Sequence, residues 1–208
     1  MKSILSFGVL LFALAFCGIG DRLKNLGGGG SDSGSSNSSS TSDASVEKPK
    51  LSSAQQSIQD GASEVKWPEQ GISWKLPAGW PKMDVKKETF NYGSPASGFL
   101  IGTISVMPSS FPADVSIKAT YDAALEQLKQ GKYARARWLE IDGVKGVEWV
   151  EAPPEEKNGI RRHQWIAFRN YQGQNQQINI IISTDGNKFE KQEDTFAAIL
   201  YSMKIPKG

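Results

Sequence analysis

The chain contains a single histidine, His163, in a stretch rich in β-branched and aromatic residues. If that stretch is a strand, His163 shares one face with Arg161, Trp165 and Arg169, because side chains alternate along a strand. A catalytic triad would need a nucleophile and an acid beside the histidine, and no spacing in the sequence suggests them. A zinc site would need more ligands than one histidine and one cysteine. We therefore expect His163 to be an ordinary sheet residue, with no catalytic residue, no metal and no cofactor in this protein.

Basic and aromatic residues offer a binding site instead. Arg135 and Arg137 fall on one expected strand, and they would lie near Arg161, His163 and Trp165 if the two strands are neighbours. Arginine and tryptophan are frequent anchors of interfaces, so such a patch would suit an acidic peptide, a lipid headgroup or a glycan. The alternative is that the six tryptophans of the chain fill the core and that the arginines are solvated.

Carboxylates supply a second hypothesis. Glu148 and Glu151 could form the acid–base pair of an envelope hydrolase, which would require a pocket and a strongly raised pKa. Glu151, Glu155 and Glu156 surround Pro153-Pro154, where we expect a solvated loop, with calcium ligation as the alternative. A third hypothesis is an envelope stress or assembly factor, for which an uncovered apolar groove would be the sign.

The expected cellular location of the protein is inferred from its first residues. A short basic start, Met1-Lys2, precedes an apolar run from Ile4 to Ile19. Such a run is typical of a secretory signal rather than of a full membrane span, which needs ~20 apolar residues. We expect a signal segment over residues 1–20.

The end of this run, Leu14-Ala15-Phe16-Cys17-Gly18, resembles a bacterial lipobox. The resemblance implies that Cys17 is lipid-modified and becomes the mature N-terminus, and a diacyl anchor would hold the protein firmly at a membrane. Phe16 stands where a lipobox has a small residue, and Ala13-Leu14-Ala15 offers an ordinary cleavage site as the alternative. Since Cys17 is the only cysteine, we expect a lipid-anchored protein of the bacterial cell envelope, on the periplasmic face or the outer surface. Without lipidation of Cys17 the protein would be secreted.

Residues 21–64 are expected to form a disordered tether. Gly27 to Gly30 and the Ser-rich run through Ser45 hold almost no apolar side chains, so they cannot bury enough surface to offset the chain entropy of folding. A Gly/Ser linker of ~38 residues has a root-mean-square span on the order of 35 Å. Within the tether, Lys50 to Gln59 could form a short helix.

Residues 65–208 remain for one domain, a length sufficient for its own core. They hold 19 of the 24 Lys and Arg and 16 of the 22 Asp and Glu, which gives a net charge of about +3. That excess is too small for a nucleic-acid footprint. Besides the membrane, we therefore expect an envelope protein, a peptide or a glycan as partner, and no nucleic acid.

The strongest β signal of this domain lies in residues 160–184. Ile178, Ile180 and Ile182 alternate with polar residues, and Gln172-Gly173 marks a tight reversal. We place this hairpin in the middle of an antiparallel sheet. Further strands are expected at residues 71–76, 85–92, 99–107, 135–141 and 144–150, with Asp142-Gly143 as a second hairpin turn.

Two helices are expected beside these strands. Residues 116–130 carry apolar side chains at helical spacing, and a final helix begins near Asn187, where Asn187 and Glu190 have the spacing of a capping box. The predicted fold class is α+β, with a mostly antiparallel sheet of about six to seven strands packed with two main helices, preceded by the signal segment and linker.

The domain resembles the PsbP-like group, small single domains with an antiparallel sheet between helices. The resemblance is carried by the opening Gly71-Ile72-Ser73-Trp74-Lys75-Leu76-Pro77-Ala78-Gly79-Trp80, by the helix after the third strand and by the segment from Phe196 to Ile205. It spans roughly residues 70–206. Members of the group include extrinsic photosystem proteins, a nuclear-transport factor and bacterial lipoproteins of unknown role. The resemblance implies a non-catalytic binding domain and no particular partner.

Overall fold

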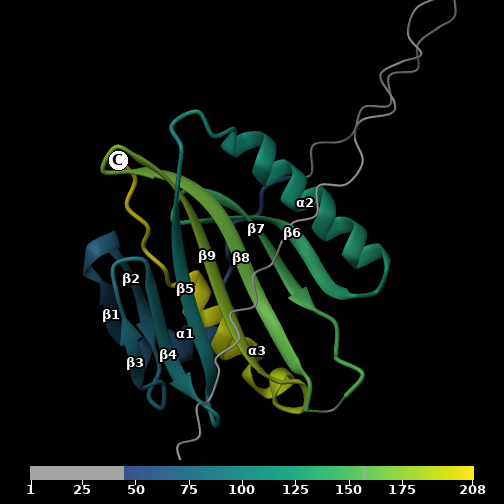
Figure 1. Ribbon diagram of the computed structural model, residues 1–208. Helices are drawn as coiled ribbons and strands as arrows, with labels where there is room; N and C mark the ends of the chain where they lie inside the picture. The colour runs from purple at the N-terminus through teal and green to yellow at the C-terminus, as the bar shows by residue number, and fades with distance from the viewer. Residues whose placement is uncertain (1–44, 157) are drawn as a thin grey trace, which may run out of the picture. The chain divides into compact units, whose positions relative to one another are not determined.

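The computed structural model describes residues 45–156 and 158–208, which make up an α+β domain (Figure 1). The expected signal segment, Cys17 and the expected tether up to residue 44 lie outside the described residues. The domain is built on a seven-stranded antiparallel sheet, accompanied by a separate pair of strands. The α+β class predicted from the sequence is confirmed.

The strands of the main sheet follow one another in the order β3-β4-β5-β9-β8-β7-β6, and every neighbouring pair is antiparallel. The strand β9 is therefore the middle strand and β8 lies next to it, as expected for the hairpin with the strongest β signal. The seven strands are β3 (Lys82–Val85), β4 (Thr89–Ser94), β5 (Gly98–Met107), β6 (Tyr133–Ile141), β7 (Val144–Glu151), β8 (Ile160–Tyr171) and β9 (Gln174–Asp185).

Both predicted hairpin turns are present. Asp142 and Gly143 connect β6 to β7 with φ values of 49° and 78°, and Gln172 and Gly173 connect β8 to β9 with φ values of 51° and 73°. Positive φ at both central residues is the geometry of a type I′ turn, which matches the twist of paired strands. Glycine at the second position adopts this conformation without steric cost.

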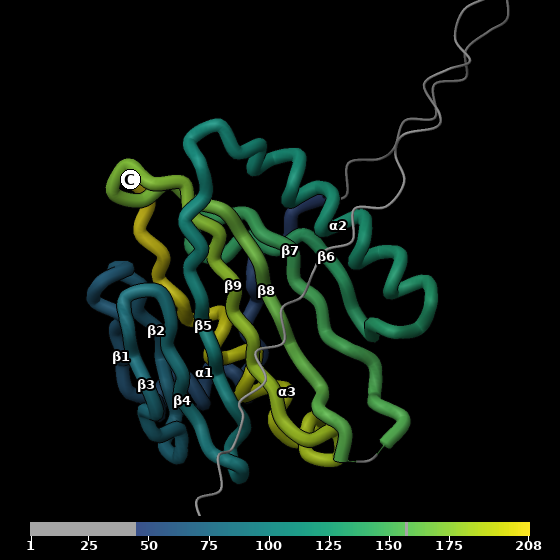
Figure 2. The backbone as a smooth tube through the Cα atoms, viewed as in Figure 1, coloured from purple at the N-terminus to yellow at the C-terminus, as the bar shows by residue number. Residues whose placement is uncertain are grey.

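Helices cover the two faces of the main sheet differently. The elements outside that sheet are α1 (Ser53–Asp60), β1 (Ser63–Trp67), the 3-10 turn η1 (Pro68–Gln70), β2 (Ile72–Leu76), α2 (Ala113–Lys129) and α3 (Gly186–Tyr201). On one face, α3 packs together with the β1–β2 pair, and α1 lies against α3. On the other face, α2 packs against β6, β7 and β8. The tube view shows α2 over the end of the sheet that holds β6, with the C-terminus beside the β8–β9 turn (Figure 2).

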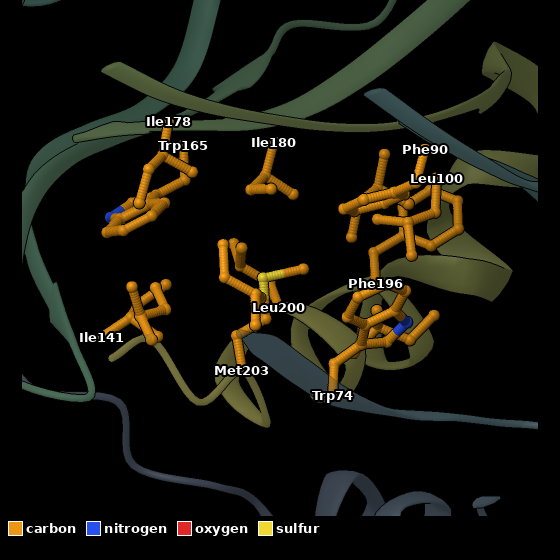
Figure 3. Packing of buried hydrophobic residues seen from close by; sticks show 14 of the residues in the cluster. Trp74, Phe90, Leu100, Ile141, Trp165, Ile178, Ile180, Phe196, Leu200 and Met203 are labelled. Atoms are coloured by element: carbon orange, nitrogen blue, oxygen red, sulfur yellow. The ribbon is translucent and has the colours of Figure 1, made fainter. Parts of the chain in front are cut away.

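The main core lies between α3 and the sheet. Strand alternation sends Ile178 and Ile180 of β9 into it, and both are fully buried. Ile180 points toward Leu200 of α3 and Met203 just after that helix, and Ile178 lies beside Trp165 on the side of the core that holds Ile141 (Figure 3). The second, smaller core lies under α2, where the ring of Tyr121 stacks on a tryptophan of β6. Burial of apolar surface on both faces is what holds the layers together.

One predicted strand proved to be two. The chain turns at residues 86–88, so that β3 and β4 form a hairpin where we expected a continuous strand over residues 85–92. The turn is held by the indole of Trp67, whose Nε1 donates to the carbonyl oxygen of Lys86 at 2.7 Å. That partner is distant in sequence, and the local pattern of residues therefore did not reveal the turn.

The predicted capping box at the start of the last helix is wrong. No side chain caps α3, which begins at Gly186. The side chain of Asn187 donates to Asn158, and the carboxylate of Glu190 accepts from Arg161. Tertiary partners have taken both side chains away from the helix terminus.

The described fold includes residues before the predicted domain boundary at residue 65. The N–H of Glu47 donates to the carbonyl oxygen of Trp138 at 3.1 Å, and the N–H of Glu140 donates to Glu47 at 2.8 Å. These bonds fix Glu47 as a parallel bridge on the outer edge of β6. The expectation of a disordered tether therefore fails for its last part.

The short helix considered for residues 50–59 is α1, and it does have a capping box. The hydroxyl of Ser52 accepts from the N–H of Gln55, whose side chain accepts in turn from the N–H of Ser52. Gln55 and Gln59 also donate to Asp194 and to the carbonyl oxygen of Ala198, both at 2.8 Å. This helix buries none of its residues. It is attached by polar contacts, which composition does not reveal.

A glycine of β5 generates a test of the core packing. A Cβ on Gly102 would lie 2.2 Å from a ring carbon of Phe90 on the neighbouring strand. Phe90 cannot move aside easily, because Trp67 and Trp74 hold its ring at centroid distances of 4.8 and 4.5 Å. Gly102→Ala should lower the free energy of unfolding by about 1–3 kcal/mol, the usual cost of overpacking. Denaturant unfolding measures this change.

Gly61→Ala is the matched control, because a Cβ there meets nothing closer than 3.7 Å. Its effect should stay within about 0.5 kcal/mol. Phe90→Leu removes the aromatic ring that the new Cβ would meet. In that background, Gly102→Ala should therefore lower the free energy of unfolding by less than it does in the wild type. Equal costs for Gly102→Ala and Gly61→Ala would contradict the packing argument.

Candidate functional site

The structure separates the two strands on which the basic patch was predicted. Arg135 and Arg137 lie on β6, whereas Arg161, His163 and Trp165 lie on β8, and β7 runs between them. Arg161, His163 and Trp165 are 5%, 0% and 0% exposed. The predicted patch is therefore not an open basic surface. All six tryptophans are buried, as the alternative expects, but its other part is wrong, because Arg161 is buried and not solvated.

Glu148 of β7 lies between the two basic strands and accepts their donors. Its carboxylate is fully buried. The guanidinium of Arg137 donates to Oε2 through Nε, and the hydroxyl of Tyr201 donates to Oε1 at 2.8 Å. Nε2 of His163 lies 2.7 Å from the same Oε1. Because an ionised carboxylate only accepts hydrogen bonds, His163 carries a hydrogen on Nε2.

A second ring of contacts reaches the surface. Arg137 donates to the oxygen of Tyr201 at 2.8 Å and to the exposed carboxylate of Glu47 at 2.6 Å. Nε of Arg135 lies 3.4 Å from the buried carboxylate, and its Nη1 lies 3.5 Å from Glu193 of α3. We call this group the Glu148 cluster. Its members are Glu47, Arg135, Arg137, Glu148, His163, Glu193 and Tyr201.

Burial and charge act in opposite directions on Glu148. Burial alone would raise its pKa, because it favours the neutral acid. The hydrogen bond of His163, the charge of Arg135 and the hydrogen bond of Arg137 outweigh burial and hold the pKa of Glu148 well below its usual range. Burial and the neighbouring carboxylate raise the pKa of Tyr201, so its phenol stays protonated at neutral pH. Glu148 is thus an ionised acceptor and not an acid with a raised pKa.

Arg161 and Trp165 connect other elements. Nε of Arg161 donates to the carbonyl oxygen of Glu151 at 2.7 Å, and its guanidinium lies 4.2 Å from the ring centroid of Phe189. The indole of Trp165 donates to the carbonyl oxygen of Leu139 on β6 at 3.1 Å. To do so the ring crosses Gly146 of β7, where a Cβ would lie 2.5 Å from the indole nitrogen.

The proposed carboxylate pair does not form. Glu148 and Glu151 differ by three positions on β7, so they face opposite sides of the sheet. The carboxylate of Glu151 lies 3.0 Å from Arg162, a residue on the face opposite Glu148. An acid–base mechanism built on these two residues is therefore excluded by their placement.

Three members of the Glu148 cluster were not identified from the sequence. Tyr201 is the last residue of α3, Glu193 lies on the polar side of that helix, and Glu47 falls in the expected tether. No local spacing connects them to β7. The one available signal was Glu148 itself, a carboxylate on the strand between two arginine-bearing strands. If it is buried there, it needs hydrogen-bond donors beyond those of its own strand.

Two further observations bear on the site. Among residues 45–156 and 158–208, no group of three or more His, Cys, Asp or Glu is placed to hold a metal ion. Over the same residues, no helix has the length and apolar character needed to cross a membrane.

Comparison with known proteins gave structural matches only. No protein-family model matches the sequence, and no curated protein matches it. Among solved structures, the chain is similar to a cyanobacterial PsbP from Synechocystis sp., with 16% identity, a TM-score of 0.45, and coverage of 70% of this chain and 94% of the other. It is also similar to LpqN of Mycobacterium tuberculosis, described as involved in cell envelope biogenesis, with 13% identity, a TM-score of 0.44, and coverage of 70% and 86%.

A third match is a structure from Bacteroides thetaiotaomicron. It shares 16% identity and a TM-score of 0.43, and the match covers 71% of this chain but only 49% of the other. The PsbP-like group named from the sequence thus reappears among the structures to which this chain is similar.

Removing the central carboxylate should destabilise the domain strongly. Glu148→Gln leaves Arg137, Arg135 and His163 without their buried negative partner, which typically costs about 3–5 kcal/mol of unfolding free energy. Glu47→Gln removes an exposed partner of the same Arg137 and should cost less than about 1 kcal/mol. Denaturant unfolding of the two variants measures the difference. Similar small losses in both would show that Glu148 is not the centre of the cluster.

The same residue should give the domain a pH-dependent stability. The folded-state pKa of Glu148 is lowered, so its contribution is fully present above the unfolded-state pKa of about 4.3 and is lost as pH falls through the folded value. The gap in unfolding free energy between wild type and Glu148→Gln should therefore narrow progressively below about pH 4. Urea unfolding of both chains over a pH series tests this. A gap that stays constant or widens in acid would contradict the assigned direction.

Proposed function

We propose that this protein is a membrane-tethered, non-catalytic binding or accessory domain of the bacterial cell envelope. The observation that carries the proposal is the position of Cys17, the only cysteine of the chain, at the end of an export-type apolar run. A Gly/Ser-rich segment follows, and then the α+β domain. A diacyl anchor at Cys17 would supply the two chains that stable membrane attachment needs.

The state of the titratable residues supports the non-catalytic part of the proposal. A general acid or base needs a pKa near the working pH and access to substrate. Glu148 has a lowered pKa and no exposed surface, and each of its oxygens already accepts hydrogen bonds. Its arrangement is that of a buried structural ion cluster.

The two alternative functions receive less support. A hydrolase built on Glu148 and Glu151 lacks its pair, because the two side chains lie on opposite faces. An assembly factor would need a continuous apolar groove. The exposed large hydrophobic residues of the described part are scattered over five different segments: Val46, Met83, Val106, Val115 and Ile160.

Expression in a bacterium with labelled palmitate tests the anchor. The wild-type chain should incorporate label and lose residues 1–16, because lipobox processing makes Cys17 the first residue. Cys17→Ser should incorporate none, and intact mass should show the acyl groups in the wild type alone. The replacement of Phe16 by a small residue, Phe16→Ala, should increase the processed fraction. An unmodified chain that begins at Phe16 would remove the anchor from the proposal.

A further inference from the structure

The outward side of β4, β5 and β9 is a second feature that the Glu148 cluster does not explain. Among the described helices, α2 packs on this face of the sheet, against β6, β7 and β8. Strand alternation directs every second residue of β5 and β9 outward, next to Gln164 of β8. We call this surface the neutral face. Its members are Asn91, Phe99, Ile101, Thr103, Ser105, Gln164, Gln177, Asn179, Ile181 and Ser183.

None of the ten members of the neutral face is charged, but charged residues border them. Asp84 of β3 lies opposite Asn91 and is paired with Lys86. Arg162 of β8 lies opposite Ser183 and is paired with Glu151. Neither β4 nor β5 contains Asp, Glu, Lys or Arg, and β9 contains only Asp185 at its end. Charged residues make up 22% of the chain. The inward residues of these strands are uncharged because they build the core, but no core explains the outward ones. Surfaces that meet only water are usually rich in charge of both signs.

The side chains of the neutral face are hydrogen-bonding groups set beside aliphatic ones. Thr103 pairs with Asn179 across β5 and β9, and Ile101 pairs with Ile181 in the adjoining row. Nε2 of Gln164 donates to Oδ1 of Asn179 at 2.8 Å, which orients that amide. In the next strand, the Oδ1 atom of Asn91 is buried and has no hydrogen-bond partner among the described residues.

Charge and polarity restrict what this surface can bind. Its ten members offer no charge to an anionic or cationic polymer, and the bordering Asp84 and Arg162 already have ion-pair partners. An apolar helix would cover amides and hydroxyls without satisfying them, at a cost of about 1–3 kcal/mol for each buried group. A chain of uncharged sugars has both properties that the surface needs: hydroxyls that donate and accept, and apolar ring faces that can rest on isoleucine and phenylalanine.

We propose that the neutral face binds an uncharged glycan strand, and this inference rests on the proposed function as an envelope binding domain. The sugar hydroxyls would hydrogen-bond with Asn179, Gln177 and Thr103, and the ring faces would lie on Ile101 and Ile181. The outward amides and hydroxyls of β5 and β9 are arranged in cross-strand rows. An extended sugar chain can follow such rows.

Titration of the isotope-labelled Cys17→Ser chain with chitotetraose and cellotetraose tests the proposal by NMR. Cys17→Ser keeps the chain free of lipid without touching the described domain. Backbone and side-chain amide signals of β5 and β9 should shift on addition of at least one tetrasaccharide, with a Kd on the order of 1 mM. Signals of α3 should not move. A negatively charged galacturonate oligomer should leave the neutral face unshifted.

Two variants of β9 form a matched pair. Gln177→Glu places a carboxylate on the neutral face, and it should weaken tetrasaccharide binding at least about tenfold, because that charge must be desolvated without a partner. Gln174→Glu makes the same chemical change at the exposed start of the strand, beside the turn, and should leave Kd unchanged. Thr103→Val keeps the shape but removes a hydroxyl, and it should weaken binding severalfold. Thermal unfolding confirms that all three variants remain folded.

The outcomes separate this inference from the anchor. An absence of shifts with both tetrasaccharides, or shifts unaffected by Gln177→Glu, would overturn it even if palmitate is incorporated at Cys17. Movement of the Gly27–Gly30 signals on introducing Gln177→Glu would assign the face to the chain's own N-terminal segment and would also overturn it. Another outcome is that amide signals shift with a tetrasaccharide while the wild-type chain incorporates no palmitate. That result would support the glycan site and contradict the lipid anchor.

Discussion

The buried carboxylate of Glu148 is the interaction on which the β6–β7–β8 half of the domain depends. An ionised group removed from water costs several kcal/mol unless hydrogen bonds and opposite charges replace its hydration. Those replacements come from β6, β8 and the end of α3, so all three elements must be in place together. The strand register meets this demand directly, since Arg137 lies opposite Glu148 on one side and Trp165 lies opposite it on the other. His163 reaches the carboxylate from the next pair on the same face, in which it lies opposite Val150.

A second buried charge, the guanidinium of Arg169, holds the other end of β8. Arg169 donates to Gln176 on β9, to both oxygens of Gln70 in η1 and to the carbonyl oxygen of Pro206 near the C-terminus. Burial lowers the pKa of Arg169 to about 10, so the guanidinium is still charged at neutral pH. Unlike Glu148, it is held by neutral acceptors and by the ring of Tyr171, 4.2 Å away. The strand β8 is thus tied by one ionic cluster and one cluster of carbonyl and amide oxygens.

Sequence reasoning was most successful where one short-range signal decides the structure. The alternation in residues 178–182 and the turn residues Asp142-Gly143 each act within a few positions, and both were read correctly. It failed where partners come from far away. The turn at residues 86–88 depends on Trp67, and the ordered segment at Glu47 depends on β6. The candidate site shows the same division. The arginines were identified, but their common partner Glu148 was expected to pair with Glu151. The contacts across β7 depend on the order of the strands in the sheet, which local sequence patterns do not reveal.

The bridge at Glu47 has a mechanical consequence. It is the first described residue to make backbone hydrogen bonds to the sheet, and its side chain also holds Arg137. Tension that travels along the chain from its N-terminal side meets these three bonds before it can reach α1 or β1. Under a small force, the two backbone hydrogen bonds between Glu47 and β6 would therefore break first. Their loss leaves both hydrophobic cores closed.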